Sequence, residues 1–133
     1  MIQRLTKRSQ FLYVRHGARA ARPSVLIEAR RREAAGEAIG LGFTASRKVG
    51  SAVVRNRARR RLREAARKLL PELGVPGADY VLVARQQTPD APWDALLDDV
   101  QNALIRLRAD LESGRGRAPR TSAKPRGPSS ESD

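Results

Sequence analysis

Apolar positions recur at two different spacings along the chain, and each spacing predicts a different kind of element. In residues 51–70 the apolar side chains repeat on one helical face, and residues 92–111 carry an apolar stripe of the same period. Both segments are therefore expected to be amphipathic helices, the first one closed by Pro71 and Gly74. A shorter helix is expected over residues 4–16.

Three further segments have the composition of β-strands. Residues 24–30 have β-branched content, residues 39–46 alternate larger apolar with small or polar positions, and residues 80–84 are a continuous apolar run. The first two are expected to pair as a hairpin. The third follows a helix, which indicates a strand-helix-strand crossover with parallel pairing. The expected fold class is therefore α/β (α+β) with a small mixed sheet.

The composition changes at residue 113, where Gly, Pro, Ser and Arg replace the apolar periodicity. We expect residues 1–112 to form one folded domain and residues 113–133 to be a disordered basic tail. The 133 residues include no Cys, which excludes disulfides and thiolate metal sites and favours a reducing compartment. Neither an apolar run of membrane-spanning length nor a signal peptide is found, so a cytoplasmic location and no membrane partner are expected.

The charge of the chain is unevenly distributed. The 27 Lys and Arg residues outnumber the 14 Asp and Glu residues, for a net charge of +13, and ten of the basic residues lie between Arg47 and Lys68 with Glu64 as the one acid there. On a helical wheel the ridge opposite the apolar stripe is basic, whereas solvated helices ordinarily mix both signs. A polyanion would relieve the repulsion between arginines one turn apart. The pattern therefore predicts a nucleic-acid partner.

Candidate catalytic chemistry is sparse. Asp94 and Asp98 have the spacing of two metal ligands on a helix, but acids at this place also suit a helix N-terminus. His16, the one histidine, lies at the expected end of a helix, where a surface or capping role is favoured over general-base work. We expect no catalytic residue, no metal site and no cofactor bound by the protein alone.

One continuous segment is recognisable. Residues 42–65, GFTASRKVGSAVVRNRARRRLREA, resemble the signature of the bacterial ribonuclease P protein component, whose centre is the Arg-Asn-Arg motif at residues 55–57. Further similarity occurs at Ser9-Gln10-Phe11 and in residues 80–85. The resemblance covers roughly residues 4–107.

The resemblance implies a subunit of ribonuclease P with the element order αβββαβα and the basic helix in a left-handed crossover, although chain physics alone favours a right-handed one. Such a subunit binds the catalytic RNA and the 5′ leader of precursor tRNA, and hydrolysis is expected from the RNA and its Mg²⁺ ions. By position, the catalytic-RNA contacts are expected to be Arg55, Asn56, Arg57, Arg59, Arg60, Arg63 and Arg67. The walls and rim of the leader cleft are expected to be Phe11, Arg15, Val25, Ile27, Phe43, Ser46, Arg47, Lys48 and Arg85.

The sequence departs from the family pattern at two of these positions. Arg15 stands where many relatives have a second aromatic residue, and Ile27 where some have an aromatic floor residue. The cleft is therefore expected to depend less on base stacking and more on charge. If the family geometry holds, Arg60 and Arg63 lie on an outer ridge and face a different partner from the cleft.

Other functions remain open at this point. A ribosomal protein or RNA chaperone would explain the charge but leaves the signature of residues 42–65 unexplained. A DNA-binding regulator lacks a preceding helix at helix-turn-helix spacing, and an RNA-recognition domain lacks its aromatic octapeptide. The subtype of catalytic RNA and the oligomeric state stay undetermined.

Overall fold

The computed structural model describes residues 1–33 and 36–114, so most of the predicted tail of residues 113–133 lies outside the described part of the chain. In chain order the elements are β1 (Ile2–Arg4), α1 (Arg8–Arg15), β2 (Ala18–Arg22), β3 (Val25–Arg31), β4 (Ile39–Thr44), the short 3₁₀ turn η1 (Arg47–Val49), α2 (Ala52–Leu73), β5 (Ala78–Ala84) and α3 (Trp93–Glu112).

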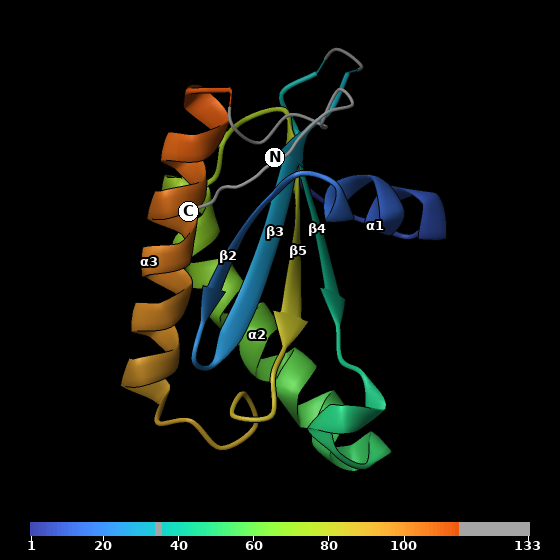
Figure 1. The fold of residues 1–133 in the computed structure, drawn as a ribbon, viewed down its shortest axis with the longest axis vertical. Coiled ribbons are helices and arrows are strands. Elements are labelled where there is room, and N and C mark those ends of the chain that lie inside the picture. The colour runs from blue at the N-terminus through green and yellow to red at the C-terminus, as the bar shows by residue number, and fades with distance from the viewer. Residues whose placement is uncertain (34–35, 115–133) are drawn as a thin grey trace, which may run out of the picture.

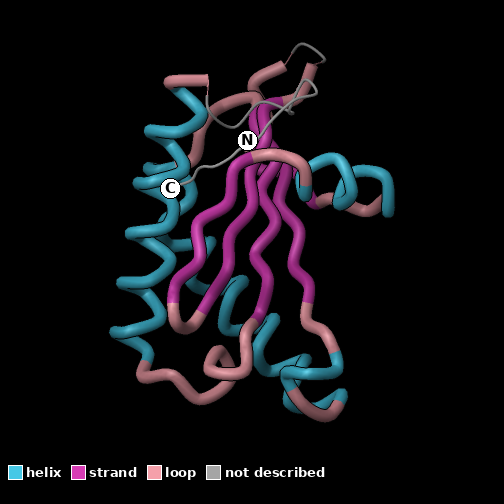
Figure 2. The backbone as a smooth tube through the Cα atoms, in the orientation of Figure 1, coloured by secondary structure: helices cyan, strands magenta, loops and turns pink. Residues whose placement is uncertain are grey.

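The strands form one five-stranded sheet in the order β1-β4-β5-β3-β2. β4 is parallel to β1 and β5, whereas β3 is antiparallel to both β5 and β2, so the predicted mixed sheet is confirmed. Figure 2 shows the strands side by side, with α3 along one side of the sheet and α1 projecting at the other. The main core lies between the sheet and α2 with α3, and a smaller apolar cluster lies under α1.

The crossover between β4 and β5 has the unusual hand that the resemblance implies. In Figure 1 both strands point downward, α2 passes behind the sheet, and β5 lies to the left of β4. This arrangement is left-handed, the opposite of the sense that strand twist favours in most parallel connections.

The predicted hairpin between residues 24–30 and 39–46 is wrong. β5 lies between β3 and β4 and pairs with both. The hairpin partner of β3 is instead β2, which pairs across the sharp turn with Arg22 opposite Val25. β2 could not be predicted, because its small and basic residues, Ala-Arg-Ala-Ala-Arg, lack a strand pattern.

The boundaries of two helices also differ from the prediction. The first helix begins only at Arg8, because residues 2–4 form β1 and pair with β4. The full order is therefore βαβββαβα. The basic helix does not stop at Pro71 but continues to Leu73, and Gly74 is its C-cap. The proline is tolerated because in the last turn it removes only one backbone hydrogen bond.

The side of α2 that faces the sheet is built from small and apolar residues. Ala58, Leu62, Ala65, Ala66 and Leu70 are all buried. They pack on the strand face that includes Tyr80, a fully buried residue whose hydroxyl accepts a hydrogen bond of 2.9 Å from the backbone N–H of Val75. Burial raises the pKa of this phenol above its ordinary value. This packing determines which side of α2 remains for solvent or a partner.

Candidate nucleic-acid interface

The basic side of α2 faces away from the core. Ser51 caps the helix and accepts a hydrogen bond of 3.3 Å from the N–H of Val54, which sets where the helical period begins. Because the sheet-facing positions are apolar, the basic residues of the helix are directed outward. Asn56, Arg57, Arg60, Arg63 and Arg67 are exposed, and Arg55 and Arg59 are half-buried.

Some of these side chains have local partners. Arg57 pairs with Asp90, Arg67 Nη2 lies 2.7 Å from Glu64 Oε1, and Arg59 Nη2 donates to Asn56 Oδ1 at 2.8 Å. Exposed ion pairs contribute only about 0–1 kcal/mol, so an RNA phosphate can replace these partners. Arg60 has no ion pair within residues 1–33 and 36–114.

Arg61 differs from its neighbours on α2. Its guanidinium donates to the carbonyl oxygens of Thr88, at 2.6 Å, and Ala91, and it lies 5.8 Å from the centre of the Trp93 ring. These contacts fasten α2 to the loop between β5 and α3. The adjacent arginines Arg60 and Arg61 thus have different surroundings, one open to solvent and the other engaged with the protein.

The predicted leader-cleft positions on β3 are wrong. Val25 and Ile27 have no exposed surface and belong to the main core on the α2 and α3 side. Successive residues of a strand point to opposite faces of the sheet, so the assignment was displaced by one residue. The α1 side of β3 carries Leu26 and Glu28 instead.

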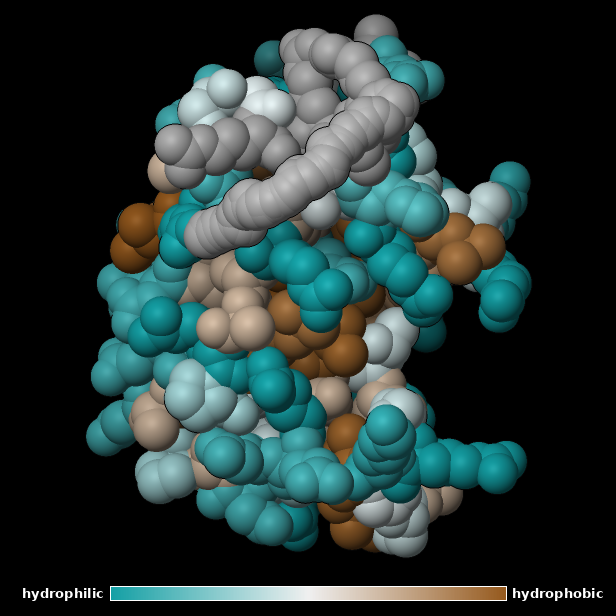
Figure 3. All heavy atoms as spheres, viewed as in Figure 1, coloured by the Kyte–Doolittle hydropathy of each residue, from teal (hydrophilic) through white to brown (hydrophobic). Residues whose placement is uncertain are grey.

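The α1 side of the sheet forms an apolar floor beyond α1. Leu26 pairs with Val83, which pairs with Thr44, and the side chains of these three residues are half-buried in one row across the strands. In Figure 3 the surface is hollowed between α1 and the region of η1. We call the row and this hollowed surface the α1-side cleft. Leu26, Thr44 and Val83 were missed from the sequence, although the period of two in each strand could have indicated them.

Glu28 lies on the same side of the sheet, one row nearer to α1. It is 7% exposed, and its cross-strand neighbours are Arg19 and Val81. Its carboxylate forms no hydrogen bond or ion pair within residues 1–33 and 36–114. An acid in this position puts negative charge under a surface whose rim is basic.

The rim of the α1-side cleft comes from two neighbouring strand ends. Ser46, Arg47 and Lys48 follow β4, Arg85 follows β5, and all four are exposed. The two loops are tied together, because the Gln86 side chain donates to the Lys48 carbonyl oxygen at 3.3 Å. Arg15, the last residue of α1, is exposed on the opposite wall.

Thr88 holds the β5 side of this rim in place. Its hydroxyl is fully buried, donates to the carbonyl oxygen of Ser24 at 2.6 Å and accepts from the backbone N–H of Arg85 at 2.7 Å. With the bond from Arg61 to its carbonyl, Thr88 connects the β2–β3 turn, α2 and the Arg85 loop. No sequence motif indicated this residue.

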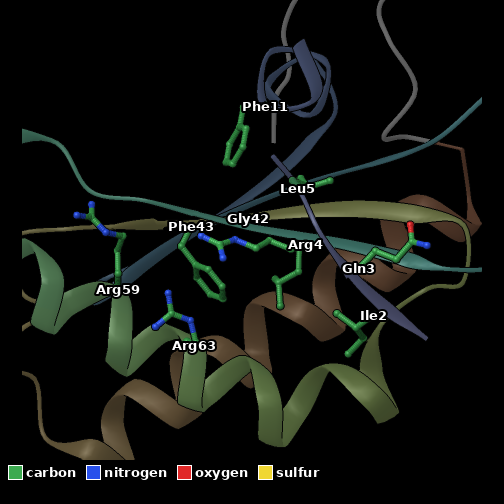
Figure 4. Close-up of a pocket in the computed structure, with 10 residues that line it drawn as sticks. Ile2, Gln3, Arg4, Leu5, Phe11, Gly42, Phe43, Arg59 and Arg63 are labelled. Carbon is green, nitrogen blue, oxygen red and sulfur yellow. The ribbon is translucent and has the colours of Figure 1, made fainter. Parts of the chain in front are cut away.

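A second hollow, of about 530 Å³, lies at the edge of the sheet between α1 and α2 (Figure 4). Phe11 and Phe43 line it together with Arg59 and Arg63, and the Arg63 guanidinium lies 5.4 Å from the centre of the Phe43 ring. The predicted separation of an outer ridge from the cleft therefore does not hold for Arg63, which contacts an aromatic residue assigned to the cleft.

Asp94 and Asp98, the residues considered as metal ligands, are both exposed on α3. The neighbouring acid Asp99 accepts hydrogen bonds from the N–H and hydroxyl of Ser24, at 3.0 and 2.6 Å. In residues 1–33 and 36–114 no three His, Cys, Asp or Glu side chains gather as a metal site. The same part of the chain contains no helix of the length and apolarity needed to cross a membrane.

Comparisons with known proteins agree with the resemblance in the sequence. A model of the family described as Ribonuclease P matches residues 2–108. The ribonuclease P protein component of Ruegeria pomeroyi is 54% identical over 108 residues, covering 79% of this chain and 86% of the relative. That of Caulobacter vibrioides is 48% identical over 112 residues, covering 84% and 75%.

Solved structures of the same kind share the fold. The RNase P protein of Staphylococcus aureus matches with a TM-score of 0.65 at 22% identity, over 78% of this chain and 94% of that one. The RNase P protein from Thermotoga maritima matches with a TM-score of 0.65 at 23% identity, over 78% and 96%.

Proposed function

The chain belongs to the ribonuclease P protein family and is a subunit of the endoribonuclease ribonuclease P, and on this premise we propose which RNA each of its surfaces binds. Its RNA partner is the ribonuclease P RNA. In our proposal the basic side of α2 binds this catalytic RNA, and the α1-side cleft binds the 5′ leader of precursor tRNA.

The basic side of α2 suits an RNA backbone because it combines many guanidinium groups with little competing acid. Arg60 and Arg63 are exposed, and Arg57 and Arg67 are held only by exposed carboxylates. Arginine presents a planar fork of donors that matches phosphate oxygens. Catalytic-RNA contacts at Arg55, Asn56, Arg57, Arg59, Arg60, Arg63 and Arg67 follow from this orientation.

The α1-side cleft suits a single strand because charge surrounds an apolar floor. The observation that carries this proposal is that Lys48 and Arg85, 37 positions apart in the sequence, stand at adjoining strand ends linked by Gln86. Arg15 adds a cation from the other wall. Phe11 is the one aromatic residue among the predicted positions on α1. A positively charged groove that follows the backbone is a general feature of sequence-tolerant binding to single strands.

Hydrolysis is assigned in this proposal to the RNA and its Mg²⁺ ions, with the protein supplying binding energy and position. The surroundings of the protein's own candidate catalytic residues support this assignment. His16 is exposed at the end of α1, and Asp99 is engaged by Ser24. Ser24, whose hydroxyl is bound to Asp99, is itself 2% exposed, so this serine–carboxylate pair is closed to a substrate.

The test compares holoenzyme affinity for precursor tRNA and mature tRNA at fixed salt. Lys48→Ala and Arg85→Ala should each lower the precursor-to-mature affinity ratio, while assembly with the catalytic RNA changes little. Arg106→Ala is the matched control, because Arg106 is an exposed arginine on α3, outside both proposed surfaces. A ratio unchanged by Lys48→Ala and Arg85→Ala, or lowered equally by Arg106→Ala, contradicts leader binding in this cleft.

A further inference from the structure

We propose that the hollow between α1 and α2 at the sheet edge holds one unpaired nucleotide of RNA, its base against Phe11 and Phe43 and its phosphate among Arg4, Arg59 and Arg63. This inference rests on the proposed function, because it places a nucleotide where the two proposed RNA surfaces meet.

The hollow exists because β1 is shorter than β4. The last backbone contact along this edge is the hydrogen bond of 2.9 Å from the N–H of Leu5 to the carbonyl oxygen of Leu41. β4 continues past that point with Gly42 and Phe43, and both line the hollow. Its volume of about 530 Å³ lies in the range of sites that enclose small molecules, roughly 300–1,000 Å³.

Two aromatic rings form its apolar part from opposite sides of the sheet edge. A Cβ atom on Gly42 would lie 2.6 Å from the Phe11 ring, so the missing side chain lets this ring rest directly on the strand. Phe43 packs against the main core with one side and lines the hollow with the other. Figure 4 shows both rings bordering the same space. A base can stack on either ring regardless of its identity.

Three guanidinium groups supply the charge. Arg59 and Arg63 project from consecutive turns of α2, and Arg4 reaches in from the end of β1 (Figure 4). No Asp or Glu is among the lining residues. Arg59 is oriented by its bond to Asn56, and Arg63 by the Phe43 ring. An apolar ligand would leave the three guanidinium groups without a counter-charge, and an acidic peptide would not stack on the two rings. A nucleotide can do both, because it has a phosphate and a base.

The free protein tests the chemistry of the hollow. Adenosine 5′-monophosphate is titrated while the ring signals of Phe11 and Phe43 are followed by NMR, with ribose 5-phosphate as the ligand that lacks a base. We expect both rings to respond to the nucleotide, and ribose 5-phosphate to bind at least about fivefold more weakly, the lower end of the effect of one stacked base. Arg63→Gln should weaken nucleotide binding several-fold, and Arg106→Gln should not. Unchanged ring signals, or equal effects of the two substitutions, overturn the proposal.

The holoenzyme identifies the source of the nucleotide. A photoreactive benzophenone side chain replaces Gln3, an exposed residue that lines the hollow, and the same group replaces Gln101, exposed on α3, as the control. Cross-linking to the precursor leader or to the catalytic RNA, beyond that from position 101, supports the proposal and names the source. No cross-link above the control overturns it. If the wild-type holoenzyme bound precursor and mature tRNA equally, the proposed leader binding would be wrong. A cross-link from position 3 to the catalytic RNA would still support a nucleotide in the hollow.

Discussion

Single residues decide how the α1-side cleft is shaped and charged. Thr88 has its hydroxyl between the carbonyl oxygen of Ser24 and the N–H of Arg85, so one buried side chain sets the position of a rim arginine. Glu28 lies under the same surface, and its carboxylate forms no ion pair within the described residues, although its cross-strand neighbour is Arg19. Thr88 therefore positions the rim of the cleft, whereas the charge of Glu28 repels a polyanion bound there.

Thr88→Val should destabilise the protein and weaken leader binding together. Loss of the hydroxyl leaves the Ser24 carbonyl and the Arg85 N–H without their buried partner, at a cost of about 1–3 kcal/mol. Thermal unfolding and the precursor-to-mature affinity ratio measure the two effects. Thr88→Ser keeps the hydroxyl and should retain most of both. If Thr88→Val lowers stability without changing the ratio, Thr88 does not position Arg85 for binding.

Glu28→Gln should strengthen binding of precursor tRNA. Removing one negative charge near the leader phosphates is expected to contribute about 1 kcal/mol, roughly fivefold in affinity, at low salt. Binding of mature tRNA, which has no leader, should not change, and the gain should shrink as salt increases. An equal gain for mature tRNA would show that Glu28 acts outside the leader site.

At the scale of elements, α2 serves two purposes with adjacent residues. One side packs on the sheet through small and apolar residues, and the opposite side carries the exposed arginines. Arg61 lies at the boundary and ties the helix to the β5–α3 loop through two backbone carbonyls. The helix can be densely basic because its attachment to the protein does not depend on the outward arginines.

Substitution of neighbouring arginines should separate these purposes. Arg61→Ala removes two hydrogen bonds from a charged group, each of which contributes up to about 3 kcal/mol to the free energy of unfolding. The thermal midpoint should therefore fall. Arg60→Ala, at an exposed position, should change stability by no more than about 0.5 kcal/mol while weakening assembly with the catalytic RNA. Denaturant unfolding and RNA binding at fixed salt check the pair. Equal loss of stability in both variants would contradict the division.

At the scale of the whole molecule, the two proposed RNA surfaces adjoin at the sheet edge. Arg63 belongs to the basic side of α2 and also lies over Phe43, beside Phe11. Arg60 and Arg67 do not line that hollow. The surfaces are thus separable only through residues on the outer part of α2.

The double variant Arg60→Ala/Arg67→Ala should reduce the salt dependence of assembly without affecting substrate choice. Each lost phosphate contact lowers the slope of log affinity against log salt by up to about 0.9 for duplex-like RNA, or about 0.7 for single strands. The precursor-to-mature ratio should stay at the wild-type value. The measurement is holoenzyme assembly at several salt concentrations, with Arg106→Ala as the control. A slope equal to that of the wild type would show that Arg60 and Arg67 do not contact phosphates of the catalytic RNA.

The sequence by itself determined the features that depend on local periodicity and charge. The helical periods of α2 and α3, the apolar run of β5 and the outward basic side of α2 were predicted, because each depends on residues close together in the chain. The parallel pairing of β4 and β5 was predicted from the order strand, helix, strand. The signature of residues 42–65 gave the family for the same reason.

The tertiary structure alone decided which segments meet. Strand periodicity does not specify the partner of a strand, so the insertion of β5 between β3 and β4 and the pairing of β1 escaped prediction. A shift of one residue reverses the face of a strand, which is why Val25 and Ile27 were assigned to the cleft when they are buried in the core. The contrast between Arg60 and Arg61, and the meeting of Phe11 with Phe43 and Arg63, likewise depend on contacts between distant segments. Such contacts form only when long-range packing brings those segments together, and no local pattern encodes them.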